Sequence, residues 1–490
     1  MGKRPNYSMV VETMSYPFKT EPYAHQLAAL DRSWEKIEYA YFMEMGTGKS
    51  KVLIDNAAML FDAGKMQGLV IVAPKGVYRN WSSKEIPAHM PSHIPIRIGV
   101  WSSRLTKEVK AELNKLFEPN DDLNILIINI DAVITKKGKL LLDKFLNTRI
   151  CMLTVDESTI IKSPSAKRTK AMIHLSRFAK YRRILTGSPV TKSPLDILSQ
   201  CDFLTPHLLG FSSYYSFRNR FAVLNEANYG GRNFKQVVGY KNTEQLHEIL
   251  QDFSYRVVKE DCLDLPDKIY MRREFEMTKE QSKVYKQMRQ SAIAFLEEGE
   301  ASTTTVLVQL LRLHQISCGF IPTDEGDIVR LENNRANELV AALEEISGKV
   351  IIWANYRNDV FLLKELLAKK YGSNSLVTYF GDTKDEERVL AVSLFQDENS
   401  DVRFFLGNTQ TGGYGITLTA AKTVIYYSNN YDLEKRLQSE DRAHRIGQKN
   451  SVTYLDLVCK GTVDEKIIKA LRNKISLAQA VTGDKWREWI

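Results

Sequence analysis

The segment Met45-Gly46-Thr47-Gly48-Lys49-Ser50 holds the residue types that bind the phosphates of a nucleoside triphosphate. Its glycines let the backbone curl so that N–H groups face phosphate oxygens, and the stretch from Lys51 to Phe61 predicts a helix whose positive end points at them. We expect Lys49 to pair with the β- and γ-phosphates and the Ser50 hydroxyl to ligate Mg²⁺. The segment therefore predicts an ATP site with Mg²⁺ as cofactor, although Met43 stands where the strict spacing has glycine.

An acidic pair, Asp156-Glu157, ends an apolar run further along the chain. An Asp at the end of a strand can hold Mg²⁺, and an adjacent Glu can orient and deprotonate an attacking water. An isolated pair of this kind would indicate a solvated turn, but the phosphate-binding segment upstream favours hydrolysis. We therefore expect Asp156 to ligate the metal together with Ser50, and Glu157 to be the catalytic base.

The segment Gln438-Ser439-Glu440-Asp441-Arg442-Ala443-His444-Arg445 carries two arginines spaced three residues apart. This spacing predicts that Arg442 and Arg445 share one face of a helix. Guanidinium groups are planar and permanently charged, which suits a transition state whose charge is spread over phosphoryl oxygens. A charged, exposed helix is the alternative interpretation, but Lys49 and the acidic pair favour a catalytic role.

Short apolar runs alternate with helical patterns in both halves of the chain. Runs of this kind, without polar alternation, are typical of strands buried on both faces of a parallel sheet. They lie at residues 69–73, 125–128, 152–155, 183–186, 349–353, 403–406, 423–427 and 452–457. Between the halves, at about 203–315, the pattern changes, and segments such as Thr278 to Leu296 predict helices. The alternation predicts two α/β units with helical insertions.

Composition limits the class of protein. With 490 residues, 43% hydrophobic and 26% charged, the chain is long enough for several globular domains. No apolar run is long enough to span a membrane and the first residues lack a signal-peptide pattern, so we expect a cytoplasmic protein. Five separated cysteines without a Cys-x-x-Cys pair indicate neither a zinc site nor disulfides. The net charge of +9 permits a polyanionic partner.

In their order along the chain, these motifs resemble the remodeller-type (Swi/Snf-like) branch of helicase superfamily 2, from about Pro22 to Leu471. The other matching segments are Pro22-Tyr23-Ala24-His25-Gln26, Ala73-Pro74-Lys75 with Asn80-Trp81, Leu185-Thr186-Gly187-Ser188-Pro189, Arg256 with Lys259-Glu260, Leu265-Pro266-Asp267-Lys268, Gln410-Thr411-Gly412-Gly413-Tyr414-Gly415-Ile416-Thr417-Leu418 and Asp441-Arg442-Ala443-His444-Arg445-Ile446-Gly447-Gln448. The last of these is the most specific. The chain departs from the family at Thr159, where His is usual, and at Met43, where an acidic residue is common.

The resemblance implies an α/β fold of two tandem RecA-like lobes with mostly parallel sheets, ATP between them, and helical insertions between and within the lobes. We expect the first lobe over 1–262, the second over 263–472 and a tail over 473–490. The implied ATP-binding residues are Gln26, which reads the adenine, the segment 45–50, and Gly415. The implied DNA contacts are Pro74, Lys75, Asn80, Lys162, Ser163, Thr411, Gly412 and Gly413, and the implied coupling residues are Thr186, Gly187 and Ser188. Trp81 could stack on a base, but packing is favoured for a lone Trp.

The resemblance favours an ATP-dependent translocase on double-stranded DNA that remodels DNA or protein–DNA complexes, as a compact, monomeric motor core of bacterial or phage type. Its setting would be the cytoplasm or nucleoid, or the host cytoplasm for a phage. The alternative in the same class is a helicase that unwinds strands or migrates branches on forked DNA. A DNA-binding scaffold with an inactive ATPase site is a third hypothesis, against which the complete catalytic set of Lys49, Glu157, Arg442 and Arg445 argues.

Overall fold

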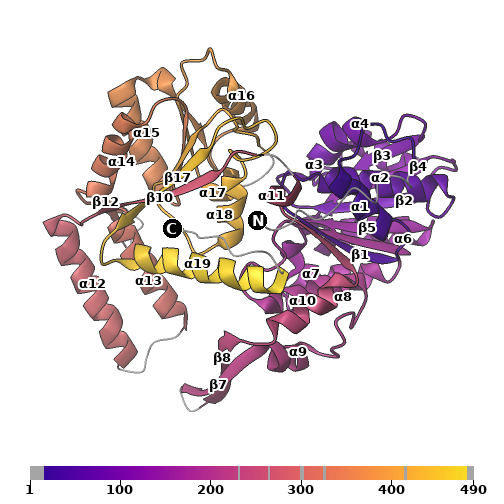
Figure 1. The fold of residues 1–490 in the computed structure, drawn as a ribbon, viewed down its shortest axis with the longest axis horizontal. Helices are drawn as coiled ribbons and strands as arrows, with labels where there is room; N and C mark the ends of the chain where they lie inside the picture. Colours follow the sequence, from indigo (N-terminus) through magenta and orange to yellow (C-terminus); the bar gives the residue numbers. More distant parts are fainter. Residues whose placement is uncertain are drawn as a thin grey trace. The chain divides into compact units, whose positions relative to one another are not determined.

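The computed structural model describes residues 16–229, 232–262, 265–297, 303–323, 327–412 and 416–482. The chain divides into two compact units, each built on its own sheet (Figure 1). Unit 1 consists of Met1–Ala227, Phe234–Asp264 and Ser476–Trp486, and unit 2 consists of Asn228–Asn233, Leu265–Ile475 and Arg487–Ile490.

Unit 1 is built on a seven-stranded sheet in the order β3-β4-β2-β5-β6-β1-β9, and all neighbouring strands pair in parallel. The strands are β1 (Glu38–Met43), β2 (Gly68–Ala73), β3 (Ile96–Val100), β4 (Leu123–Asn129), β5 (Cys151–Asp156), β6 (Tyr181–Leu185) and β9 (Ser254–Val257). Alternate residues of one strand enter different cores: Val70 lies in one hydrophobic cluster, and its neighbours Leu69 and Ile71 lie in another. A strand buried on both faces needs apolar residues throughout, which explains the uninterrupted runs in the sequence.

Helices and short helical turns connect these strands. They are α1 (Ala24–Ser33), α2 (Lys49–Asp62), α3 (Tyr78–Asn80), η2 (Trp81–Glu85), α4 (Ile86–His89), α5 (Lys107–Lys115), η3 (Ile130–Ile134), α6 (Lys136–Asn147), η4 (Ser158–Ile161), α7 (Lys167–Ser176), η5 (Pro194–Asp196), α8 (Ile197–Leu204), α9 (Tyr214–Phe221), α10 (Thr243–Gln251) and α11 (Lys259–Cys262). Because helices on both faces cover a parallel sheet, the carboxyl ends of its strands are left to carry loops.

Unit 2 repeats this design with a six-stranded parallel sheet in the order β10-β17-β16-β13-β15-β14. Its strands are β10 (Lys268–Phe275), β13 (Val350–Trp353), β14 (Leu376–Tyr379), β15 (Phe404–Gly407), β16 (Thr423–Tyr426) and β17 (Val452–Cys459), with a separate antiparallel pair of β11 (Phe320–Pro322) and β12 (Ile328–Arg330). Its helical elements are α12 (Lys279–Glu297), α13 (Thr303–Ser317), α14 (Asn334–Glu345), α15 (Arg357–Tyr371), η6 (Ser373–Ser375), α16 (Asp385–Gln396), α17 (Thr409–Gly412), α18 (Leu433–Glu440) and α19 (Val463–Thr482), whose residues from Ser476 on belong to unit 1.

The predicted fold class is confirmed: both large sheets are parallel, and every predicted apolar run lies on one of their strands. The helix predicted at 278–296 is α12. Strands were missed within the region expected to be helical: β9 and β10, which belong to the two large sheets, and β7 (Ala222–Tyr229) and β8 (Arg232–Tyr240), which form a two-stranded sheet. The signal for β7 and β8 was Gly230-Gly231 between two β-favouring runs, a dipeptide typical of hairpin turns.

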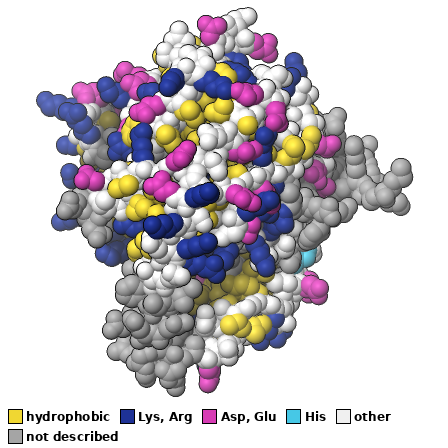
Figure 2. All heavy atoms as spheres, turned by 90° about the vertical axis from the view of Figure 1, so that its left-hand side faces the viewer, with side chains coloured by type: hydrophobic (Ala, Val, Ile, Leu, Met, Phe, Trp, Pro, Cys, Tyr) yellow, Lys and Arg dark blue, Asp and Glu magenta, His cyan; other side chains and the backbone are white. Residues whose placement is uncertain are grey.

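One face of the molecule is mixed in charge. On the face that carries α12, α14 and α15, Lys and Arg side chains lie among Asp and Glu side chains (Figure 2). None of the helices in the described ranges is long and apolar enough to cross a membrane. A mixed surface of this kind is usual for a globular protein in water.

A buried ion pair joins α14 to α19 in unit 2. The guanidinium of Arg335, which is fully buried, forms an ion pair with Asp464 and donates to the carbonyls of Tyr427 (2.6 Å) and Leu457 (3.1 Å). Cys459 N–H donates to the same carboxylate at 3.0 Å. Removing one partner of a buried pair leaves the other charge without a counter-charge. This lowers the free energy of unfolding by about 3–5 kcal/mol.

We predict that Arg335→Met lowers the free energy of unfolding by about 3–5 kcal/mol, because Asp464 loses its charged partner. Urea unfolding followed by circular dichroism measures the change. The matched control is Arg330→Met, since Arg330 pairs with Glu365 at 3.4 Å while both side chains are mostly exposed. Equal unfolding midpoints for the two variants would contradict the structural role of Arg335.

Candidate nucleotide site and its supporting networks

The loop between β1 and α2 has the backbone shape of a phosphate cradle. Gly46 and Gly48 have φ angles of +80° and +87°, which side-chain-bearing residues rarely adopt. A Cβ atom added at Gly48 would lie 2.1 Å from the Nε2 atom of Gln26, so any larger residue there would displace the Gln26 side chain. Helix α2 begins at Lys49, and its first N–H groups have no acceptor within the helix. The residues present therefore fit a bound phosphate chain.

Gln26 and His25 attach the start of α1 to this loop. Both side chains reach the carbonyl of Thr47, from Gln26 Nε2 at 3.1 Å and from His25 Nε2 at 2.8 Å. The other end of the Gln26 amide accepts from Tyr23 N–H at 3.0 Å, and Gln26 is buried. Burial lowers the pKa of His25, so the imidazole is neutral at neutral pH. Gln26 thus lies against the loop, and its contact with adenine stays a prediction.

Asp156 ends β5, as expected, and Trp81 orients its carboxylate. The indole Nε1–H of Trp81 donates to Asp156 Oδ2 at 3.0 Å, and the backbone N–H of Glu157 donates to Oδ1 at 3.0 Å. Burial raises the pKa of Asp156, against the Trp81 hydrogen bond and the charge of Lys49. Trp81 is 2% exposed, which confirms packing rather than base stacking. Its hydrogen bond to the acidic pair had no signal in the sequence.

Glu157 occupies a strained backbone position. Its φ angle is +50°, in the left-handed region that non-glycine residues rarely adopt. The chain turns there from β5 into η4, where Thr159 is buried and the Ser158 hydroxyl donates to Gln200 at 2.7 Å. Strain of this kind persists where the surrounding structure enforces it, and it is concentrated at functional sites.

The predicted coupling residues contact the nucleotide loop. Thr186 N–H donates to Tyr41 O at 3.2 Å, and a Cβ atom at Gly187 would lie 3.0 Å from the backbone nitrogen of Met45. Ser188 N–H donates to the Thr186 hydroxyl at 3.1 Å. A shift of this turn would therefore be transmitted directly to the loop.

Two further residues tie the loop to β9 and α11. Arg256 on β9 donates to Phe42 O at 3.0 Å and to Gly187 O at 2.9 Å. The Glu44 carboxylate accepts from Lys259 N–H at 2.8 Å, while Glu44 N–H donates to Val257 O. The sequence had marked Arg256 and Lys259 only by resemblance, and Glu44 had no assigned role.

The predicted DNA contacts come from the ends of strands in both units. In unit 1, Pro74 follows β2 and is buried, Lys75 is exposed, and Asn80 ends α3. Lys162 donates to the Thr191 hydroxyl at 2.6 Å, and Ser163 beside it is exposed. In unit 2, Thr411 and Gly412 lie in α17, directly after β15, whereas Gly413 and the nucleotide candidate Gly415 lie outside the described residues.

The expectation that Arg442 and Arg445 lie on a helix is wrong, because α18 ends at Glu440. The carbonyl of Arg442 accepts from Leu418 N–H at 2.9 Å instead of taking part in a helix. The two guanidinium groups nevertheless converge on one carbonyl, that of Ile416, at 3.3 and 3.4 Å. Arg445 also donates to the Thr417 hydroxyl at 3.0 Å. The structure thus brings both arginines together in the turn that follows α18 (residues 441–445, called the arginine turn below).

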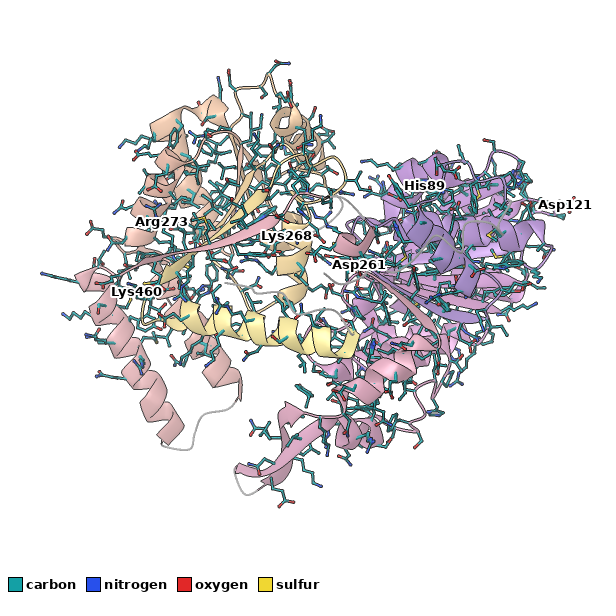
Figure 3. All side chains as sticks on the ribbon, in the orientation of Figure 1. His89, Asp121, Asp261, Lys268, Arg273 and Lys460 are labelled. Atoms are coloured by element: carbon teal, nitrogen blue, oxygen red, sulfur yellow. The ribbon has the colours of Figure 1, made fainter. Side chains whose placement is uncertain are left out.

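A buried ion network lies directly before the arginine turn, at Glu440, the last residue of α18. Glu440, fully buried, accepts from Arg436 at 2.8 Å and from the Tyr270 hydroxyl at 2.7 Å, and it lies 3.3 Å from Lys268 Nζ. Arg436 in turn binds Asp456 through two hydrogen bonds, at 2.5 and 3.1 Å. Burial opposes the charge of Lys268 (labelled in Figure 3), but Tyr270 and Glu440 keep its pKa above the ordinary value.

The other end of the arginine turn contacts the residues just before β10. His444 Nε2 lies 2.6 Å from the carbonyl of Pro266, two residues before Lys268 at the start of β10. The segment Pro266–Lys268, which resembles the family's connection between lobes, therefore contacts the arginine turn at two points.

Fold and site together define a two-unit α/β protein with a phosphate loop, an acidic strand end and a paired arginine turn. The model of the SNF2-related domain matches residues 41–320, more than half of the chain, and that of the helicase conserved C-terminal domain matches residues 333–447. The chain belongs to the SNF2-related family, the remodeller-type branch of helicase superfamily 2 predicted from its motifs. The predicted enzyme class, a helicase-type ATPase, is confirmed at the level of the family.

Named relatives cover nearly the same part of the chain. SWI/SNF chromatin-remodeling complex subunit snf22 of Schizosaccharomyces pombe is 26% identical over 457 residues, which are 89% of this chain and 26% of that protein. Probable ATP-dependent DNA helicase CHR12 of Arabidopsis thaliana is 26% identical over 446 residues, 89% of this chain and 39% of that protein. The chain therefore spans only a minor part of the length of these relatives. Among solved structures, the Sulfolobus solfataricus SWI2/SNF2 ATPase core in complex with dsDNA aligns with a TM-score of 0.42 at 24% identity, covering 96% of this chain and 95% of that chain.

We predict that Gly48→Ala weakens nucleotide binding by at least about tenfold, because the added Cβ strains the loop and displaces Gln26. Titration with a fluorescent ATP analogue measures the affinity. The matched control is Gly64→Ala, since Gly64 also has a positive φ, +65°, but no atom lies within 4 Å of its added Cβ. If both variants lost affinity equally, the loss would come from a general destabilisation of the fold by backbone strain and not from a change in the phosphate cradle.

We predict that Lys268→Met lowers kcat by about tenfold with little change in the KM for ATP, because it disturbs the arginine turn and not the phosphate loop. Lys268→Arg should restore most of the activity, since it keeps a positive charge beside Glu440. The control is Lys460→Met, which removes an exposed partner of Glu274 at 3.3 Å (Figure 3). A raised KM with unchanged kcat would contradict this role.

Proposed function

We propose that the chain is a double-stranded-DNA translocase that couples ATP hydrolysis to movement and so remodels DNA or protein–DNA complexes. The observation that carries this proposal is the pairing of a phosphate cradle with an oriented acidic pair in a chain of the SNF2-related family. The names of the relatives, which include chromatin-remodelling subunits and DNA helicases, support DNA as the partner.

The chain's own residues account for the main tasks of hydrolysis. The loop from Met45 to Gly48 holds the phosphates with backbone N–H groups, and Lys49 neutralises their charge. Glu157 accepts the proton of the attacking water and orients it in line with the bond that breaks. Arg442 and Arg445 stabilise the charge that develops on the phosphoryl oxygens.

The donors at this site also suit a magnesium ion. Mg²⁺ prefers hard oxygen ligands and is usually held by one or two protein oxygens together with substrate phosphates. The Ser50 hydroxyl and the Asp156 carboxylate would hold it, with Trp81 fixing the rotation of that carboxylate. A bound Mg²⁺ would neutralise part of the negative charge of the phosphates.

The DNA contacts follow from the same strand ends. Lys75, Asn80, Lys162 and Ser163 of unit 1, and the α17 segment with Thr411 of unit 2, are proposed to bind the sugar–phosphate backbone without reading sequence. The turn Thr186–Ser188 is proposed to link these contacts to the nucleotide loop, against which it packs.

The experiment that tests the proposal measures ATP hydrolysis alone and with duplex DNA, single-stranded DNA or RNA. A translocase on duplex DNA should be stimulated most strongly by the duplex. A strand-displacement assay on forked DNA then separates translocation from unwinding, because a translocase releases no single strands. Equal stimulation by RNA would overturn the proposal, and release of single strands would replace it with the unwinding alternative.

We predict that Glu157→Gln abolishes turnover, lowering kcat by about 10²–10⁴-fold while ATP still binds, because an amide cannot accept the proton of the water. Single-turnover hydrolysis and equilibrium binding of ATP measure the two effects separately. Normal turnover in this variant would remove Glu157 from its assigned role.

We predict that Arg445→Ala lowers kcat by about 10³-fold, the effect typical of an arginine that stabilises the phosphoryl transition state. Steady-state hydrolysis at saturating ATP and duplex DNA measures it. Lys449→Ala, at an exposed position four residues on, is the control for charge loss near the turn. A change below about twofold in Arg445→Ala would leave Arg445 as a structural residue only.

A further inference from the structure

The hairpin of β7 and β8 takes no part in the nucleotide site; its residues 222–227 and 234–240 belong to unit 1, and residues 228–233 are assigned to unit 2. Its two strands form a sheet of their own, apart from the seven-stranded sheet. Figure 1 shows the strands projecting beyond α9, and in the sequence α9 and α10 flank them. A two-stranded ribbon alone is marginally stable in water. Here the base of the hairpin is anchored, because Tyr240 packs against the hydrophobic core of unit 1.

The hairpin and its flanking residues carry a net positive charge. Residues 214–241 carry five Lys or Arg and one Asp or Glu, a net charge of +4, whereas the other 462 residues carry only +5. The face in Figure 2, in contrast, mixes both signs. A local excess of one sign marks a surface that favours a polyanion.

The described basic side chains of this element are available to a partner. Lys235 on β8 and Lys241 just after it are exposed, and neither pairs with a carboxylate among the described residues. Arg220 is exposed and donates to the Gln245 amide at 2.8 and 2.5 Å, which orients the guanidinium without neutralising it. Asn225 and Gln236 are also exposed and add amide donors.

These features suit the backbone of duplex DNA. A two-stranded ribbon has the width that the major groove of B-form DNA admits, and Lys, Arg, Asn and Gln are donors to phosphate oxygens. We propose that the β7–β8 hairpin is a second DNA-binding element, which contacts the phosphate backbone of duplex DNA through Arg220, Lys235 and Lys241. The choice of duplex DNA rests on the proposed function.

The test compares the double variant Lys235→Gln/Lys241→Gln with the wild-type chain. Fluorescence anisotropy of a labelled DNA duplex gives the affinity at several salt concentrations. Each phosphate contact contributes about 0.9 to the slope of log affinity against log salt, so losing two contacts should reduce the slope by about 1.8 and the low-salt affinity by about tenfold. Hydrolysis without DNA should not change.

The matched control is Lys136→Gln/Lys139→Gln, which removes two exposed lysines from α6 of the same unit. An unchanged slope in the hairpin variant, or an equal loss in the control, would overturn the inference. A larger loss of single-strand binding than of duplex binding would overturn the commitment to duplex DNA.

The design separates this inference from the proposed function. If the wild-type chain binds duplex DNA and the hairpin variant weakens that binding, the inference stands even where DNA fails to stimulate hydrolysis. If DNA stimulates hydrolysis and the variant binds with wild-type affinity and slope, the proposed function stands and the hairpin inference fails. Absence of any DNA binding by the wild-type chain overturns both.

Discussion

The parallel pairing of strands is the constraint on which the candidate site depends. In a parallel sheet every strand ends at the same edge, so residues far apart in sequence meet there. In unit 1, the loops after β1, β5 and β6 carry the phosphate cradle, the acidic pair and the coupling turn, respectively. Strands buried on both faces fix these loops because neither face can shift without opening a core.

Burial of charge imposes a second constraint on both units. Arg183 in unit 1 is fully buried, and its guanidinium is satisfied by Asn56 Oδ1 and by four backbone carbonyls. In unit 2, the buried carboxylate of Glu440 is satisfied by Arg436, Lys268 and Tyr270. Such groups tolerate few alternative arrangements, since each donor or acceptor left alone is unfavourable. Because Glu440 directly precedes the arginine turn, the position of the turn depends on Arg436 and Lys268, which are not among the predicted catalytic residues.

How much the sequence could predict depends on the range of the interactions. Apolar runs predicted the central strands because a strand that is buried on both faces needs apolar residues throughout its length. Glycine spacing predicted the cradle because the backbone shape of that loop depends only on neighbouring residues. The end of α18 was missed, since it depends on a residue outside the segment: Leu418 N–H donates to the carbonyl of Arg442. The bond from Trp81 to Asp156 likewise joins residues 75 positions apart, and no local pattern specifies it.

The two departures from the family pattern have a physical interpretation in this structure. Met43 ends β1 with its side chain fully buried in a hydrophobic cluster, so the position belongs to the core. A carboxylate there would need a buried partner, and the chain instead keeps its acid at Glu44, where it accepts from Lys259 N–H.

Thr159 is likewise buried within η4, whereas the neighbouring Asp156 keeps two hydrogen-bond donors on its carboxylate. Neither departure removes a charged group from the set of Lys49, Asp156 and Glu157. Both replace a polar family residue by one that packs in the interior. The groups of unit 1 on which the predicted hydrolysis depends are therefore all present.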